Sequence, residues 1–201
     1  MLKIGVLALQ GSVREHIQQI QKVGCVAVAV KSTEDLKGLN GLILPGGEST
    51  AIRKLLDQNN LLEPIRTLAK EGMPVFGTCA GLILLAGKVV GCESPHLGLM
   101  DVVVERNSYG RQVDSFEVEL SIKNIGRNIP AVFIRAPHIV SVGQNVEILA
   151  TFDNRIVLAR DRHFLGCSFH PELTEDVRII KYFVDMIQQF NHTSLAKLDG
   201  I

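Results

Sequence analysis

One of the four cysteines lies between two glycines, in Gly77-Thr78-Cys79-Ala80-Gly81. The apolar run Pro74–Phe76 precedes this segment, and the helix-like run Leu82–Ala86 follows it. The order predicts a strand, a sharp turn and a helix, with the sulfur at the turn, which is the layout of a nucleophile elbow. Side chains in place of the two glycines would collide with neighbouring backbone at so tight a bend. The following helix directs its N-terminal N–H groups and positive dipole end at the sulfur, which favours the reactive thiolate. A small buried thiol is the alternative for any single cysteine.

A histidine and a glutamate occur two residues apart in Phe169-His170-Pro171-Glu172. A cysteine nucleophile needs a base within hydrogen-bond reach, and the base needs a third group that fixes its tautomer. Pro171 disfavours a helical conformation at His170, and residues two apart in an extended chain face the same way. We therefore expect Glu172 to hold one ring nitrogen of His170 while the other faces Cys79. Taken alone, the pair also fits a loop histidine beside an exposed glutamate.

A pair of glycines follows a short apolar run in Leu42-Ile43-Leu44-Pro45-Gly46-Gly47-Glu48-Ser49-Thr50. Backbone N–H groups next to glycine can approach a ligand closely, as an oxyanion hole for acyl transfer requires. Ser49 or Thr50 is expected to cap the helix that follows. A tight strand-to-helix turn without a ligand is the alternative, and no Gly-Lys-Ser/Thr follows to make a phosphate-binding loop.

Together these three segments resemble the signatures of class I, triad-type glutamine amidotransferases. More narrowly, the chain is similar to the glutaminase subunits of pyridoxal 5′-phosphate synthase. That narrower resemblance rests on Leu7–Gly11, Gly46–Thr50, Glu105–Gln112 and Phe133–Pro137. It extends from about Lys3 to Phe190.

The resemblance implies that Cys79, His170 and Glu172 hydrolyse L-glutamine to L-glutamate and ammonia without a cofactor or metal. It implies that the ammonia passes to a separate synthase subunit within a large hetero-oligomer, where pyridoxal 5′-phosphate is made. Backbone N–H groups at Gly47 and Ala80 are the candidates for holding the oxyanion. The family's glutamine-binding positions fall on Gly46, Gly47, Glu48, Arg106, Ile134 and Arg135.

Two other functions remain open for this sequence. One is the glutaminase subunit of another ammonia-using synthase, such as that of histidine biosynthesis. The Gly-Gly-Glu-Ser-Thr turn and the segment that contains Arg106 argue against it. The other is a catalytically idle regulatory subunit, against which the presence of Cys79, His170 and Glu172 argues.

A partner surface is expected beside the predicted site. Ligands of an open parallel sheet lie outside the carboxyl ends of its strands. That edge brings Gln10 and Gly11 together with the glycine turn and Cys79. A synthase docked there would seal the site and receive ammonia. We therefore expect the isolated chain to be a poor glutaminase that docking activates.

Composition places few further limits on function. The 201 residues include 21 Lys plus Arg and 21 Asp plus Glu, so the formal net charge is zero. No basic block suggests nucleic acid, no run approaches a transmembrane length, and no cysteine or histidine spacing suggests zinc. The chain is expected to be cytoplasmic, where its four cysteines would remain thiols.

The periodicity of apolar residues predicts a single-domain, three-layer α/β fold. Strands and helices alternate in the first half, which predicts a doubly wound, mostly parallel sheet. Short strands separated by turns predict antiparallel additions in the second half. We expect an amidotransferase domain over 1–190 and a C-terminal tail over 191–201. Local expectations are a capping box of Ser12 and Glu15, a solvated His16, Cys167 in the core and Thr174 as the N-cap of the last helix.

Overall fold

The computed structural model describes residues 1–106 and 115–198. Ten strands of this part form one sheet in the order β2-β1-β3-β4-β12-β11-β9-β6-β5, with β10 paired to β11. From β2 to β12 every neighbouring pair is parallel, whereas β11 is antiparallel to β9, β10 and β12. The predicted three-layer α/β fold, with antiparallel additions in the second half, is confirmed.

The elements before the nucleophile are β1 (Lys3–Leu7), α1 (Val13–Lys22), β2 (Val26–Val30), η1 (Thr33–Leu36), β3 (Gly41–Leu44), α2 (Ser49–Gln58), α3 (Leu62–Lys70) and β4 (Val75–Thr78). Those after it are α4 (Ala80–Leu85), β5 (Ala86–Val89), β6 (Met100–Glu105), β7 (Phe116–Ile122), β8 (Gly126–Phe133), β9 (His138–Val142), β10 (Val146–Phe152), β11 (Arg155–Asp161), β12 (Phe164–Cys167), η2 (Pro171–Leu173) and α5 (Arg178–Leu198).

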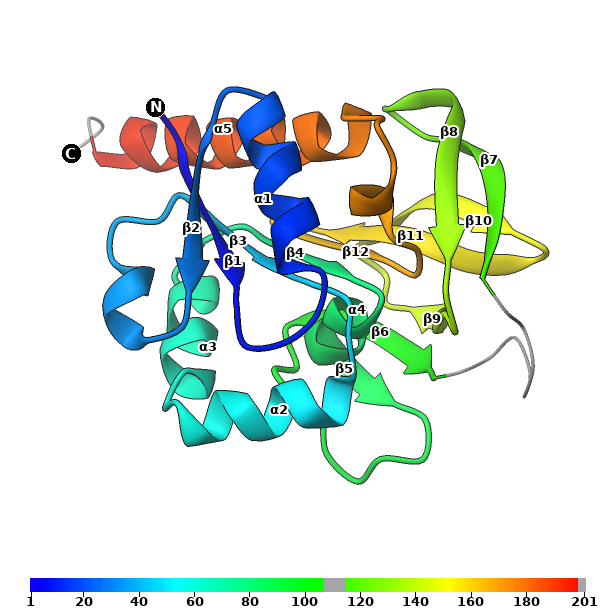
Figure 1. Cartoon of the computed structure of the whole chain (residues 1–201), viewed down its shortest axis with the longest axis horizontal. Coiled ribbons are helices and arrows are strands. Elements are labelled where there is room, and N and C mark those ends of the chain that lie inside the picture. Colours follow the sequence, from blue (N-terminus) through cyan, green and yellow to red (C-terminus); the bar gives the residue numbers. More distant parts are fainter. Residues whose placement is uncertain (107–114, 199–201) are drawn as a thin grey trace.

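The helices cover the two faces of the sheet (Figure 1). α1 and α5 lie over one face, and α2, α3 and α4 lie over the other. Side chains alternate along each strand, so Leu42 and Leu44 of β3 join the core beneath α2–α4 while Ile43 joins the core beneath α1 and α5. Strands buried on both faces read as continuous apolar runs, which explains why β3 and β4 were recognisable in the sequence.

Strands β7 and β8 form a separate two-stranded sheet that the sequence did not predict. Its apolar residues join the core beneath α1 and α5, where the ring of Phe133 lies 5.4 Å from the ring of Phe169. The backbone N–H of His170 donates a hydrogen bond to the carbonyl oxygen of Val132 at 2.8 Å. The small sheet therefore fastens the segment that carries His170 to the strand that leads into Ile134 and Arg135.

Several local predictions need correction. Thr174 does not cap the last helix, because α5 begins four residues later and the carboxylate of Asp176 accepts the N–H of Arg178 at 2.8 Å. The structure also adds two strands that the sequence did not predict, β5 and β9. Helix α5 extends from Arg178 to Leu198 and passes the domain boundary expected at residue 190. That boundary stays a prediction.

Candidate active site

Cys79 occupies the turn between β4 and α4, as the sequence predicts. Its backbone has φ 49° and ψ −104°, a conformation that costs free energy for any residue with a Cβ atom. Close backbone contacts enforce the turn. A Cβ atom at Gly81 would lie 2.0 Å from the carbonyl oxygen of Leu44, and one at Gly77 would lie 2.4 Å from that of Gly81. The two glycines are therefore required by space.

His170 and Glu172 form the predicted pair. Nδ1 of His170 lies 2.7 Å from Oε1 of Glu172, and both side chains are buried. The expected extended geometry is wrong, because Pro171–Leu173 forms a 3-10 turn. This turn, rather than an extended chain, brings the carboxylate back to the imidazole ring.

The electrostatics of the pair favour a charged imidazole. Burial disfavours the imidazolium, but hydrogen bonds to Cys79 and Glu172 and the charges of both residues outweigh it and raise the pKa of His170 to about 10. Burial likewise opposes ionisation of Glu172, yet His16, His170 and Ser12 together hold its pKa below the usual value. At neutral pH the imidazole of His170 is therefore charged beside the carboxylate of Glu172.

Helix α1 supplies contacts to Glu172 that the sequence analysis missed. The expected capping box is wrong: Ser12 makes no side-chain cap, and its Oγ instead donates to Oε1 of Glu172 at 2.6 Å. His16 is not solvated but only 2% exposed, and its Nε2 lies 3.5 Å from Oε2 of Glu172. Its spacing from Val13, Ile17 and Ile20 places it on the apolar face of α1, and that spacing was the signal of burial available in the sequence.

The glycine turn lies against both the histidine and the first loop. A Cβ atom at Gly46 would lie 2.3 Å from Cε1 of His170, and one at Gly47 would lie 2.4 Å from Oε1 of Gln10. The N–H of Glu48 donates to the same Gln10 oxygen at 2.9 Å. A Cβ atom at Gly11 would lie 1.8 Å from the carbonyl oxygen of Gly46. The exposed residues Gln10 and Gly11 thus contact the turn directly.

Glu48, not Ser49 or Thr50, is the N-cap of α2. Its carboxylate accepts the backbone N–H groups of Thr50 at 3.1 Å and Ala51 at 2.6 Å. Burial opposes ionisation, but these bonds and the nearby charge of Arg106 lower the pKa of Glu48. The charge of Arg106 therefore acts on the carboxylate that follows the glycine turn. Residues 107–112 of the same family segment lie outside the described residues.

Ile134 and Arg135 follow β8, and the backbone of Ile134 lies beside the nucleophile. The carbonyl oxygen of Ile134 lies 3.9 Å from Sγ of Cys79. Arg135 is exposed and has φ 44°, while the next residue, Ala136, is buried. Cys167, expected in the core, is fully buried, and burial raises the pKa of its thiol well above the usual value.

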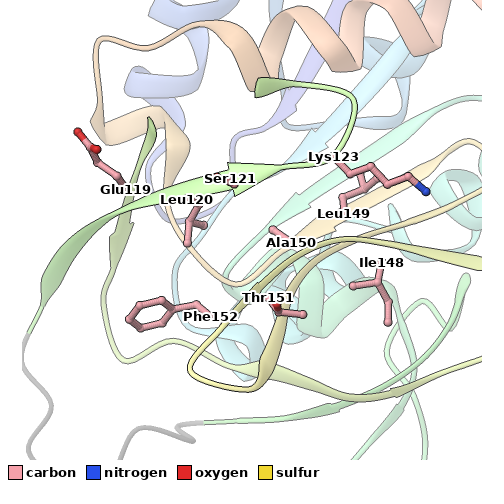
Figure 2. A pocket seen from close by; sticks show the side chains of 9 residues that line it. All are labelled: Glu119, Leu120, Ser121, Lys123, Ile148, Leu149, Ala150, Thr151 and Phe152. Atoms are coloured by element: carbon pink, nitrogen blue, oxygen red, sulfur yellow. The ribbon is translucent and has the colours of Figure 1, made fainter. Parts of the chain in front are cut away.

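A shallow hollow of about 480 Å³ lies elsewhere, between β7 and β10 (Figure 2). Its lining consists of Glu119, Leu120, Ser121, Lys123, Ile148, Leu149, Ala150, Thr151 and Phe152, none of which belongs to the predicted site. Within residues 1–106 and 115–198, no group of three or more His, Cys, Asp or Glu side chains is placed to hold a metal ion. In the same part of the chain, no helix is long and apolar enough to cross a membrane.

The sheet is doubly wound, a cysteine lies at a strand-to-helix elbow, and a histidine follows the neighbouring strand. This combination is typical of the class I glutamine amidotransferases. A solved crystal structure of a glutamine amidotransferase has this fold, with a TM-score of 0.88 at 46% identity, covering 92% of this chain and 98% of that one. The chain belongs to the SNO glutamine amidotransferase family, whose sequence model matches residues 6–189.

Two bacterial relatives narrow the similarity further. The pyridoxal 5′-phosphate synthase subunit PdxT of Geobacillus thermodenitrificans is 61% identical over 188 residues, which cover 94% of this chain and 96% of the relative. The protein of the same name from Geobacillus kaustophilus is 58% identical over 196 residues, covering 98% of this chain and all of the relative. The resemblance inferred from the sequence is confirmed.

Proposed function

We propose that this chain hydrolyses L-glutamine to L-glutamate and ammonia and delivers the ammonia to a separate synthase subunit that makes pyridoxal 5′-phosphate. The observation that carries the proposal is the 2.7 Å contact between Nδ1 of His170 and Oε1 of Glu172, in a segment that follows the strand paired with the one leading into Cys79. The relatives named as subunits of pyridoxal 5′-phosphate synthase support the choice of partner. They also favour this synthase over that of histidine biosynthesis.

The reaction begins at the sulfur of Cys79. The thiolate attacks the side-chain amide carbon of glutamine, and a C–S bond forms as the amide oxygen takes up negative charge. Backbone N–H groups of Gly47 and Ala80 receive this oxyanion. Ala80 is the first residue of α4, so its N–H has no acceptor within the helix. Loss of one such donor typically costs on the order of 3 kcal/mol of transition-state stabilisation.

His170 then manages the proton. The imidazolium donates its proton to the amide nitrogen, the C–N bond breaks, and ammonia leaves a glutamyl thioester on Cys79. The neutral imidazole next accepts a proton from water, which attacks the thioester carbon. Glutamate departs and the thiolate returns. Glu172 orients the ring and stabilises its charged form throughout.

Glutamine is held by groups around this centre. We assign substrate binding to Gly46, Gly47 and Glu48 of the glycine turn and to Ile134 and Arg135, which follow β8. The guanidinium of Arg106 or Arg135 suits the α-carboxylate of the substrate, and Glu48 suits its ammonium group. Gln10 and Gly11, which are exposed beside the glycine turn, face the synthase. We also propose that residues 1–190 form the amidotransferase domain, and that the protein is cytoplasmic, as suits its four free thiols.

The test measures glutamate release from glutamine by the purified chain mixed with the pyridoxal 5′-phosphate synthase subunit. We expect hydrolysis and a complex of the two proteins on size-exclusion chromatography. A complex without hydrolysis would favour the idle regulatory subunit. Hydrolysis without any complex would assign the ammonia to another synthase.

A further inference from the structure

The carboxylate of Glu172 lies among three polar side chains, those of Ser12, His16 and His170. Its side chain is fully buried, and Oε1 accepts hydrogen bonds from Nδ1 of His170 at 2.7 Å and from Oγ of Ser12 at 2.6 Å. Among the described residues, Oε2 has no hydrogen-bond partner, and Nε2 of His16 is 3.5 Å away. His170 alone would hold Oε1 by one hydrogen bond, whereas Ser12 adds a second and His16 lies beside Oε2.

His16 connects the same carboxylate to the residue before the nucleophile. Its Nε2 lies 3.2 Å from Oγ1 of Thr78, next to Cys79. Burial lowers the pKa of His16, against the opposing charge of Glu172, so the ring is neutral near pH 7. With its proton on Nε2, the ring presents one N–H between Thr78 Oγ1 and Glu172 Oε2.

Helix α1 is itself fastened to the 3-10 turn that carries Glu172. Nε2 of Gln19 donates to the carbonyl oxygens of Pro171 and Thr174, each at 3.0 Å, and lies 3.2 Å from that of Asp176. The α1 region therefore contacts the Glu172 side chain through Ser12 and the backbone around η2 through Gln19. Motion of α1 would change the position of the carboxylate.

The loop before α1 also holds the glycine turn. The N–H of Ser12 donates to the carbonyl oxygen of Gly46 at 3.3 Å, and Gln10 accepts the N–H of Glu48. Three consecutive residues, Gln10–Ser12, thus contact both the candidate oxyanion site and the candidate orienting carboxylate.

We propose that Ser12 and His16 are positioning residues for glutamine hydrolysis, which set the orientation of Glu172 and couple it to the loop that contacts the glycine turn. The inference rests on the proposed function, and it adds α1 to the parts of the fold that determine the catalytic rate. Neither residue touches the reacting atoms. Each acts through the carboxylate that orients His170.

The titratable groups that face Glu172 come from two sides. His16 of α1 and His170 both favour its ionised form, as does the hydroxyl of Ser12. From β12, the thiol of Cys167 faces Glu172, whose charge adds to burial in raising the pKa of that thiol. Burial lowers the pKa of His16, and the charges of Glu172 and Glu15 oppose this shift. The hydrogen bond from Ser12 lowers the pKa of Glu172. Removal of this hydroxyl should therefore raise that pKa and move the acid limb of the pH–rate profile to higher pH.

The experiment compares steady-state hydrolysis by wild type, Ser12→Ala, Ser12→Thr, His16→Leu and His16→Gln in complex with the synthase subunit between pH 5 and 9. Ser12→Ala should lower kcat by on the order of tenfold, the factor expected for one hydrogen bond to a charged group. His16→Leu should lower kcat by a similar or smaller factor, because it removes the ring nitrogen that lies 3.5 Å from Oε2. Their KM for glutamine should stay within about twofold, because the substrate contacts are intact. Ser12→Thr and His16→Gln keep a hydroxyl and an N–H donor, and should recover most of the rate.

Gln21→Ala, on the exposed side of α1, is the matched control and should leave kcat and the pH profile unchanged. Thermal unfolding of every variant distinguishes lost rate from lost fold, and the conservative pair remains informative if Ser12→Ala or His16→Leu unfolds. If folded Ser12→Ala keeps the kcat and the acid limb of the pH–rate profile of the wild type, the inference is overturned. The proposed function still stands in that case, provided that the wild type hydrolyses glutamine. Failure of conservative variants to recover rate despite a native fold would overturn the inference equally. Absence of hydrolysis by wild type in the complex would instead refute the proposed function.

Discussion

The backbone N–H of Cys79 donates a hydrogen bond to the carbonyl oxygen of Cys167 at 2.9 Å. This bond continues the parallel pairing of β4 with β12, in which Thr78 lies opposite Cys167. His170 follows Cys167 by three residues, so the register of the two strands determines how the imidazole meets the sulfur. The candidate nucleophile and base are therefore aligned by the centre of the sheet, although 91 positions separate them in the chain.

Replacement of Cys79 by alanine should lower glutamine hydrolysis by on the order of 10⁴-fold or more, because the sulfur is the attacking atom. The fold should remain, since the Cβ atom and the backbone of the turn are unchanged. Glutamate release and circular dichroism check the two outcomes. Co-purification with the synthase subunit controls for partner binding. Substantial hydrolysis by Cys79→Ala would show that another residue is the nucleophile.

Replacement of Glu172 by glutamine should lower kcat by about 10²-fold, less than loss of the sulfur, because an amide still orients the ring but does not stabilise its charge. The pKa of His170 should fall from about 10. Because the folded pKa exceeds the unfolded value of 6.5, the ion pair stabilises wild type fully below pH 6.5 and loses this effect as pH rises through 10.

Imidazole titration by NMR and urea unfolding of wild type and Glu172→Gln between pH 6 and 10 measure both effects. The difference in free energy of unfolding between the two proteins should shrink as the pH rises. An identical His170 titration in both proteins would mean that Glu172 does not control the charge of the ring.

His16 should make the fold sensitive to mild acid. Its folded pKa lies below 6.5, so under pH 6.5 the unfolded chain binds a proton that the folded chain does not. The free energy of unfolding should therefore fall as pH drops below 6.5, by up to about 1.4 kcal/mol per pH unit from this group. In His16→Gln this contribution disappears. Urea unfolding from pH 8 to 5 measures the two slopes, and equal slopes would contradict a buried neutral His16.

Docking to the synthase subunit should raise the rate by on the order of 10²-fold, the effect of one oxyanion donor. Gln10 and Gly11 are exposed and contact the glycine turn, so a partner that covers them can reorient one of its peptides. Ammonia released without an acceptor would be protonated in water and lost as a nucleophile. Glutamate release with and without the synthase measures the ratio, and Cys79→Ala with synthase gives the background. Equal rates would disprove activation.

The sequence predicted those parts of the fold and site that depend on local patterns. The elbow at Cys79 has its two glycines and apolar flanks within the contiguous residues 74–86, and β3 and β4 are visible as short apolar runs. The sequence pairs His170 with Glu172 correctly, but the expected geometry is wrong. A 3-10 turn, not an extended chain, brings the two side chains together. Their catalytic roles remain predictions.

Contacts between residues that are far apart in the sequence cannot be predicted from such local patterns. The Ser12 hydroxyl matches a capping box with Glu15, yet it bonds a carboxylate 160 positions away. Nothing in the alternation of β7 and β8 indicates that they form a separate sheet, since alternation fixes which side chains share a face and not which strands pair. Glu48 displaced Ser49 and Thr50 as the cap because its longer side chain folds back onto two N–H groups.

The backbone of Cys79 has a consequence for how sequence variation at this position should be interpreted. A non-glycine residue at φ 49° is held there at a cost of roughly 1–3 kcal/mol, and glycine would relieve that cost. Cysteine is therefore the less stable choice for the fold at the one position where the proposed chemistry requires it. Selection for thermal stability alone would drive this site toward an inactive enzyme, so preservation of the thiol depends on continued demand for the reaction.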